Sequence, residues 1–358
     1  MTIASHPEVI RLLEMYLNYA KTNSMASVGI VMCAHPNLAT ADFAGETQME
    51  PHLQEGLERL LEKVKAAVEL WALPETDESL DRSNVVFDVA AGPLNHDFLI
   101  WLIDAEMTRR RFNAPGPLKV AFWLGKDASE RLEEDNRKQW LEMVFRPLLK
   151  MIGAVESLNV HGWKKQVYVP RDIVKACADG EAVPLLRSGL PPRHPGAVTI
   201  TLRESWYWPH RNSNKDAWLR FAGYLRDRGE KVVVVRDTEK AFDNFADFTT
   251  DPEASLYTQK RMALYESAKC NLFTSSGPVG LALFSNRPWL QFVKLEDDDS
   301  PYKPNTKAFW EEANGVSVGG QYPWSAYDQR IVWAADTFDN IVAAWEDLNL
   351  ERNLSYGT

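Results

Sequence analysis

The stretch Cys270-Asn-Leu-Phe-Thr-Ser-Ser-Gly-Pro278 decides the fold, because a strand-like run passes directly into a polar glycine turn. Short, largely apolar runs of this kind are typical of strands that are covered on both faces, as in parallel sheets. Pro278 suits the first turn of a helix, where its missing N–H costs nothing. The stretch therefore predicts a strand, a turn and a helix, which is the repeating unit of parallel α/β sheets.

The same alternation continues on both sides of this turn. In the second half, the predicted strands are residues 197–202, 231–236, 270–274, 288–293 and 316–318, and the predicted helices are 213–228, 254–268, 277–285 and 336–348. In the first half, the predicted strands are 28–33, 85–89, 118–124, 156–160 and 166–169, and the predicted helices are 51–70, 94–111 and 129–151. This order predicts an α/β protein with two Rossmann-like, doubly wound parallel sheets.

A change of composition separates the two halves. Residues 180–196 contain four prolines, which can neither continue a helix nor pair inside a sheet. We therefore expect an N-terminal domain of residues 1–180, a linker of 181–196 and a C-terminal domain of 197–358, with the two domains facing a cleft. The last helix could cross back to the first domain.

Composition limits the classes of function and the compartment. The net charge of −10 argues against a general nucleic-acid binder, which needs a basic face. The three cysteines, Cys33, Cys177 and Cys270, are odd in number, scattered and without a Cys-x-x-Cys pair, which indicates neither a disulfide framework nor a zinc site and suits a reducing compartment. Glu8 and Arg11 interrupt any apolar signal sequence. We therefore expect a cytoplasmic protein without an integral membrane segment.

The turn after the 270–274 strand is a candidate anion site. Ser275 and Ser276 supply hydroxyl donors, Gly277 allows close approach to the backbone, and Pro278 opens a helix whose N–H groups and dipole favour negative charge. The alternative interpretation is that Ser276 only caps the helix. The residues that end the neighbouring strands favour the anion site.

Polar residues follow the first two strands of the second half, at the edge where open parallel sheets bind ligands. They are Arg203, Glu204, Arg211, Arg236, Asp237 and Thr238. Arginine is well suited to bidentate contacts with phosphate. Glu266, in the helix before the turn, is a candidate acceptor for the ribose hydroxyls of a nucleotide, although an exposed helix position is an equal alternative.

In the first half, His96 and Asp97 open the 94–111 helix on the side of the expected cleft. Either could act as a general base on a hydroxyl group. The alternative for Asp97 is a helix start in which Asn95 caps and Asp97 favours the dipole. His35 is a weaker candidate.

No group of His, Cys or carboxylate residues has the spacing of a metal site. Glu296-Asp-Asp-Asp299 contains carboxylates, but it follows the fourth strand in a proline-containing loop and reads better as a solvated charge run. We therefore expect no bound metal and no cofactor.

With its Ser275-Ser276-Gly277 turn and Arg203, the chain resembles bacterial metal-independent nucleotide-sugar glycosyltransferases of the GT-B fold. The resemblance includes heptosyltransferase-like and fucosyltransferase-like members and uncharacterised proteins of sugar-biosynthesis clusters. It implies that the C-terminal domain holds a nucleotide-sugar donor, that the turn contacts the diphosphate, and that Arg203 neutralises the leaving nucleotide. The glutamate pair of retaining members is not evident, which favours inversion. The sugar or glycan acceptor is a hydroxyl compound that the sequence does not identify.

Two other functions stay open. A nucleotide-sugar epimerase can share this architecture and would need no acceptor. A non-catalytic sugar- or nucleotide-binding protein would bind its ligand without turnover. A dinucleotide-dependent oxidoreductase is disfavoured, because neither the 28–33 nor the 197–202 strand is followed by Gly-x-Gly-x-x-Gly.

Overall fold

A computed structural model describes residues 82–89, 95–123, 137–158, 163–164, 170–206, 208–297 and 305–356, which all fall in one compact unit. The predicted strands 28–33 and 166–169, the predicted helix 51–70, Cys33 and His35 lie outside the described residues. Among the helices within those ranges, none is both long and apolar enough to cross a membrane.

The first half forms a parallel sheet with the strand order β3-β2-β1-β4 in the described residues. Its strands are β1 (Asn84–Asp88), β2 (Lys119–Trp123), β3 (Val155–Ser157) and β4 (Trp163–Lys164). Helix α4 (Phe98–Arg111) joins β1 to β2. The helical run before β3 consists of α6 (Arg137–Trp140), the π-helical turn Leu141–Phe145 and α7 (Arg146–Ile152). The predicted strands at 85–89 and 118–124 and the predicted helix at 94–111 are confirmed.

Aromatic packing fixes the first turn of α4. The ring of Phe87 in β1 meets Phe98 edge-on, with centroids 4.8 Å apart, and Phe98 in turn packs on Phe145 at 4.3 Å. All three side chains are buried. Because Phe98 directly follows His96 and Asp97, this packing sets the position of both candidate bases.

The second half forms a six-stranded parallel sheet with the order β10-β9-β8-β5-β6-β7. Its strands are β5 (Val198–Thr201), β6 (Val232–Val235), β7 (Thr249–Thr250), β8 (Cys270–Thr274), β9 (Trp289–Phe292) and β10 (Gln329–Val332). If the six strands are numbered 1 to 6 along the chain, their order across the sheet, starting from β7, is 3-2-1-4-5-6, which is the order of a Rossmann sheet. The strand order reverses between β5 and β8, while all strands stay parallel. The predicted fold class is therefore confirmed. The prediction of a strand at 316–318 is wrong, and β7 and β10 were not predicted.

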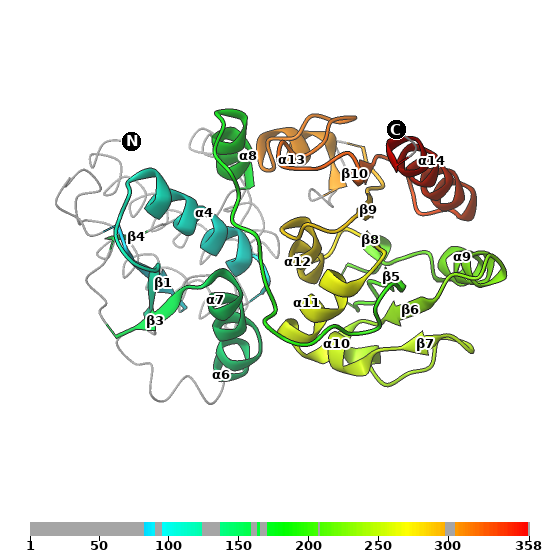
Figure 1. The fold of residues 1–358 in the computed structure, drawn as a ribbon, viewed down its shortest axis with the longest axis horizontal. Helices are drawn as coiled ribbons and strands as arrows, with labels where there is room; N and C mark the ends of the chain where they lie inside the picture. The colour runs from blue at the N-terminus through cyan, green and yellow to red at the C-terminus, as the bar shows by residue number, and fades with distance from the viewer. Residues whose placement is uncertain are drawn as a thin grey trace, which may run out of the picture. The chain divides into compact units, whose positions relative to one another are not determined.

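Helices cover both faces of this sheet (Figure 1). Helices α9 (Lys215–Asp227) and α14 (Phe338–Tyr356) pack on the side of Val198 and Ile200, and the alternate residue Ala197 packs toward α10 (Pro252–Leu256) and α11 (Thr258–Ser267). The predicted helix 254–268 is thus two helices, which are separated by Tyr257 in an extended conformation. Helices α8 (Pro170–Ala178) and α13 (Lys307–Glu312) were not predicted.

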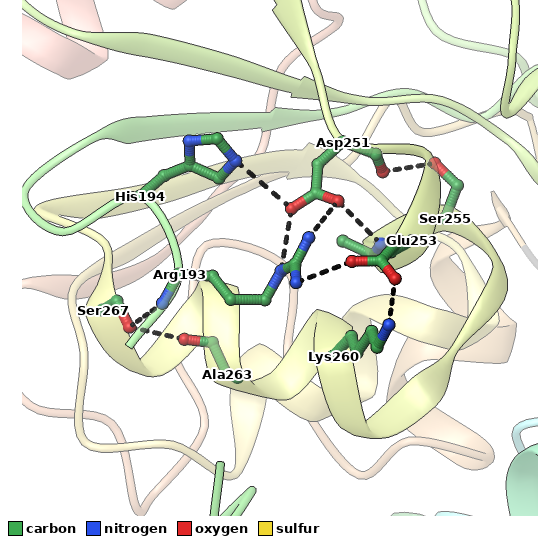
Figure 2. Close-up of polar contacts among 9 residues, drawn as sticks. Arg193, His194, Asp251, Glu253, Ser255, Lys260, Ala263 and Ser267 are labelled. Carbon is green, nitrogen blue, oxygen red and sulfur yellow. Dashed lines mark hydrogen bonds and ion pairs between the residues drawn. The ribbon is translucent and has the colours of Figure 1, made fainter. Parts of the chain in front are cut away.

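Residues 181–196, which we call the strap, contain neither helix nor strand, in agreement with the proline-rich sequence. The strap is nevertheless fastened to the second sheet's helices. Figure 2 shows Asp251, which is 2% exposed, accepting hydrogen bonds at 2.7 and 3.1 Å from Arg193. Asp251 also lies 3.5 Å from His194 and caps α10 through the backbone N–H of Ala254. The boundaries predicted for the two domains stay a prediction.

Candidate functional site

A cavity of about 670 Å³ lies where the chain leaves β5 and β8. This is the point at which the strand order reverses, where open parallel sheets bind their ligands. The polar lining includes Asn95, His96, Asp97, Arg203, Arg211, Ser275, Ser276 and Gln291. The apolar lining includes Leu99, Ile173, Leu283, Phe284, Trp310, Tyr322 and Trp324. The cavity thus brings together most of the residues that the sequence selected around the serine turn, together with several that it did not.

Arg203 enters the cavity wall from the end of β5. Its side chain is largely buried, at 8% exposure, and burial lowers the pKa of the guanidinium. Its Nη1 donates to the carbonyl of Trp208 at 3.0 Å and to Oδ1 of Asn212 at 2.5 Å. Arg203 therefore both shapes the following loop and brings a positive charge to the cavity.

Arg211 comes back to the same cavity at the end of that loop. Its guanidinium lies over the ring of Trp208, 5.6 Å from the centroid, and its Nε is buried without a hydrogen-bond partner among the described residues. Burial and the neighbouring Arg203 lower the pKa of Arg211 to about 10, while Asp97 acts in the opposite direction. Arg211 keeps its charge at neutral pH. Two repelling cations beside a cavity are a direct electrostatic complement to an anion.

The serine turn follows β8 as predicted, but the helix behind it is short. Ser276 is extended and its side chain makes no capping hydrogen bond, so the capping interpretation of Ser276 is wrong. A 3₁₀ turn, Gly277–Val279, leads into α12 (Gly280–Leu283), which has four residues instead of the predicted 277–285. A helix this short contributes little dipole, and the hydroxyl groups of the turn are the stronger feature.

Two glycines bring the turn against α4. A Cβ on Gly277 would lie 3.0 Å from Cβ of His96, and a Cβ on Gly280 would lie 3.1 Å from Cδ2 of Leu99. The sequence suggested that Gly277 leaves room for a ligand. In the structure, His96 takes the space next to Gly277, and Pro278 also lines the cavity.

The two candidate bases have different properties. Burial, aided by Arg261, lowers the pKa of His96 to about 3, and its ring packs edge-on against Trp140. Such a group is a weak base at neutral pH. Asp97 occupies the N-cap position of α4, but its side chain makes no capping bond and accepts instead from Asn95 Nδ2 at 2.9 Å. Of the two candidate bases, Asp97 is therefore the better suited to accept a proton in the cavity.

Glu204 and the three residues predicted after β6 do not line the cavity. Arg236 donates to both carboxylate oxygens of Glu204, at 2.5 and 2.7 Å. Asp237 accepts from the backbone N–H groups of Glu204 and Thr238 at 3.1 and 2.8 Å, and Thr238 is exposed. The hydrogen bonds of Arg236 and Asp237 at the end of β6 are thus made to other groups of the protein. A role of these four residues in ligand binding stays a prediction without support from the cavity.

Glu266 is also engaged elsewhere. Its Oε2 accepts from the backbone N–H of Ser188 at 3.0 Å and from the Ser188 hydroxyl at 2.5 Å, and Arg187 lies 3.7 Å away. Glu266 therefore holds the strap in place and does not line the cavity.

Sequence reasoning missed the aromatic part of the cavity and Gln291. Tyr322 stacks on Trp324 with ring centroids 4.7 Å apart, and Trp324 stacks on Phe284 at 5.4 Å. Such a wall can pack against an uncharged ring. The tryptophan-rich composition was the one available signal, because no spacing separates these rings from ordinary core residues.

In the parts of the chain that the structure describes, no group of three His, Cys, Asp or Glu residues could hold a metal ion. The run 296–299 is described only as far as Asp297, and Glu296 pairs with Lys294 at 3.2 Å. Independence of metal stays a prediction.

No family model and no curated protein matches the chain. Among solved structures, it is similar to a glycosyl transferase of family 9 from Veillonella parvula, at 10% identity over 75% of this chain and 97% of that chain, with a TM-score of 0.43. It is also similar to the E. coli heptosyltransferase WaaC with ADP-2-deoxy-2-fluoro heptose, at 13% identity over 75% of this chain and 99% of that chain, with a TM-score of 0.42. A third similar structure is a UDP-GlcNAc 2-epimerase from Methanocaldococcus jannaschii, at 13% identity over 86% of this chain and 78% of that chain, with a TM-score of 0.29. Because all three TM-scores lie below 0.5, the function is argued from the site.

Proposed function

We propose that the chain is a glycosyltransferase that takes a sugar from a nucleotide-diphosphate sugar and transfers it to a hydroxyl acceptor. The observation that carries this proposal is the convergence of Arg203 and Arg211 with the serine turn between β5 and β8. Two cations and two hydroxyl groups suit a diphosphate, whose charge would relieve the repulsion between the arginines. The location at the reversal of strand order supports a nucleotide ligand.

The apolar half of the cavity supports a substrate that also has uncharged rings. Trp310, Tyr322 and Trp324 form an aromatic wall beside the anion-binding half. Aromatic faces pack well against the flat face of a nucleobase and the C–H face of a sugar. A cavity of about 670 Å³ falls in the range usual for small-molecule sites.

In the proposed reaction, the acceptor hydroxyl attacks the anomeric carbon while the bond from that carbon to the diphosphate oxygen breaks. Asp97 takes the proton of the attacking hydroxyl, and the diphosphate leaves with the bonding electron pair. Arg203, Arg211 and the hydroxyls of Ser275 and Ser276 stabilise the charge that develops on the leaving group. The reaction inverts the anomeric centre if displacement is direct, and the residues named require no metal.

The first experiment is calorimetry with ADP, UDP, GDP and inorganic pyrophosphate. We expect binding of pyrophosphate and tighter binding of at least one nucleoside diphosphate. Absence of binding by all four would contradict the proposal.

A turnover assay then separates the enzyme classes. Transfer is supported if the protein releases nucleoside diphosphate from a nucleotide sugar only when an acceptor is added. We expect the same rate of release with and without EDTA. Conversion of the nucleotide sugar without an acceptor would identify an epimerase, and binding without turnover a non-catalytic protein.

A further inference from the structure

Gln291 connects β9 to the serine turn. Its side chain is buried, at 3% exposure, yet the residue lines the cavity. Its Nε2 donates a hydrogen bond to Oγ of Ser275 over 3.0 Å. β9 is paired in parallel with β8, so the sheet itself holds Gln291 beside the end of the strand that delivers Ser275.

The direction of this hydrogen bond decides what Ser275 can offer a ligand. A serine hydroxyl has one donor and can accept two hydrogen bonds, whereas the amide nitrogen of glutamine can only donate. Since Ser275 accepts from Gln291, its own O–H is left to donate to another group. Ser275 is half-buried and lines the cavity, where an anion is the natural acceptor.

Tyr322 lies beside the same amide. Its phenol is buried and interacts with Gln291, which offsets part of the rise that burial causes in the pKa of that phenol. The carbonyl oxygen of Gln291 is buried without a hydrogen-bond partner among the described residues.

We propose that Gln291 is a positioning residue, which orients the Ser275 hydroxyl as a donor to the bound anion. The proposal rests on the proposed function, because it assumes that the cavity holds the diphosphate of a nucleotide. It adds a residue from the neighbouring strand to the groups that act on that diphosphate.

Two substitutions separate orientation from simple packing. Gln291→Met keeps the length of the side chain and removes both polar groups, so the Ser275 hydroxyl is no longer held. Gln291→Glu replaces the donor by an oxygen, to which Ser275 would then donate, and it also brings a negative charge close to the anion. We therefore expect affinity to fall in the order wild type, Gln291→Met, Gln291→Glu.

The decisive experiment is a double-mutant cycle on the affinity for inorganic pyrophosphate, measured by calorimetry. Ser275→Ala should weaken binding roughly 10-fold, as expected for loss of a hydrogen bond to a charged group. Gln291→Met should weaken binding by about 3- to 10-fold in the wild-type background and have no further effect when Ser275 is alanine. An equal effect in both backgrounds, or no effect in either, would overturn the proposal.

Gln329→Met is the matched control. Gln329 is similarly buried in β10, at 5% exposure, where its Nε2 donates to the carbonyls of Ser285 and Arg287, outside the cavity. Its substitution should lower the melting temperature without changing pyrophosphate affinity. Failure of the wild type to bind pyrophosphate would overturn this inference and the proposed function together. Binding that Arg211→Ala weakens, but that shows no coupling between Gln291 and Ser275, would overturn this inference alone.

Discussion

Arginines end two neighbouring strands of the second sheet, but only one of the two strand ends lines the cavity. Arg236, after β6, donates to both carboxylate oxygens of Glu204 and to two backbone carbonyls. Arg211, in the loop after β5, lies near the like charge of Arg203 and has a buried Nε without a partner among the described residues. The difference between the two strand ends is that a carboxylate holds Arg236 through two hydrogen bonds, whereas Arg211 lies beside another cation at the cavity.

The largest expected effect concerns Asp97, the cavity carboxylate whose charge acts on Arg211. Asp97→Asn should lower turnover by about 10²- to 10⁴-fold, the usual contribution of a general base. Affinity for a nucleoside diphosphate should stay the same or rise, because a negative charge near Arg211 is removed. Steady-state rates and calorimetry on the same preparation test both halves. Near-normal turnover would show that the base lies elsewhere.

Substitution of Arg236, at the end of β6, should lower the free energy of unfolding. Arg236→Ala leaves Glu204, whose side chain is 15% exposed, without its partner. Breaking a largely buried ion pair costs about 3 kcal/mol. Chemical denaturation should show this loss, and Arg226→Ala, which removes an exposed pair with Asp247, should cost less than about 1 kcal/mol. Equal losses in the two variants would mean that the pair at the end of β6 is not a stabilising one.

Protonation sharpens the contrast, since Arg211 stays charged in the cavity while His96 stays neutral. The pKa of His96 is about 3 in the folded chain, against an ordinary value of 6.5, so the unfolded chain binds the extra proton first as the pH falls. Stability from this group is complete above the ordinary pKa and is lost as the pH falls toward the folded value. Between pH 7 and pH 5 the loss is about 2 kcal/mol.

His96→Gln has no titrating group at this position and should lack that part of the acid destabilisation. Denaturation curves of the wild type and the variant at the two pH values measure it. Identical pH dependence in both proteins would contradict the assignment of a buried neutral imidazole.

The smallest effect concerns the contact between the turn and α4. Gly277→Ala places a Cβ 3.0 Å from Cβ of His96, so the turn or the helix must shift slightly. We expect a loss of about 1 kcal/mol in stability and a weaker effect on ligand affinity than substitution of either cavity arginine. Gly223→Ala, in α9 with open space around its Cα, is the control. A gain in stability for Gly277→Ala would show that His96 does not restrict this position.

Much of the fold follows from local sequence patterns. Strand β8 and the four consecutive valines of β6 are recognisable because buried parallel strands are short and apolar. Strand β10 escapes this pattern, because it contains Gln329 and Arg330 at the edge of the sheet. The helix expected at 277–285 is shorter than predicted, because a 3₁₀ turn takes up its first three residues.

The site is only partly predictable, because a side chain's role depends on partners that lie far away in sequence. Arg203 and the serine turn, which line one cavity, were selected by the rule that open parallel sheets bind ligands at the carboxyl ends of their strands. For Glu266 the sequence leaves ribose binding and an exposed helix position as equal alternatives, and it gives no sign of the partner Ser188, which is 78 residues away in a segment without secondary structure. Gln291 carries no motif, and its contact with Ser275 follows from the pairing of β8 with β9.

The central claim is that Arg211 binds the anion and Arg236 does not. The measurement is the affinity of Arg211→Ala and Arg236→Ala for the nucleoside diphosphate that the wild type binds, by calorimetry on folded protein. Arg211→Ala should weaken binding roughly 10- to 100-fold without lowering the melting temperature, because repulsion from Arg203 is relieved. Arg236→Ala should keep its affinity despite lower stability. Unchanged affinity in Arg211→Ala, or an equal loss in both variants, would contradict the account.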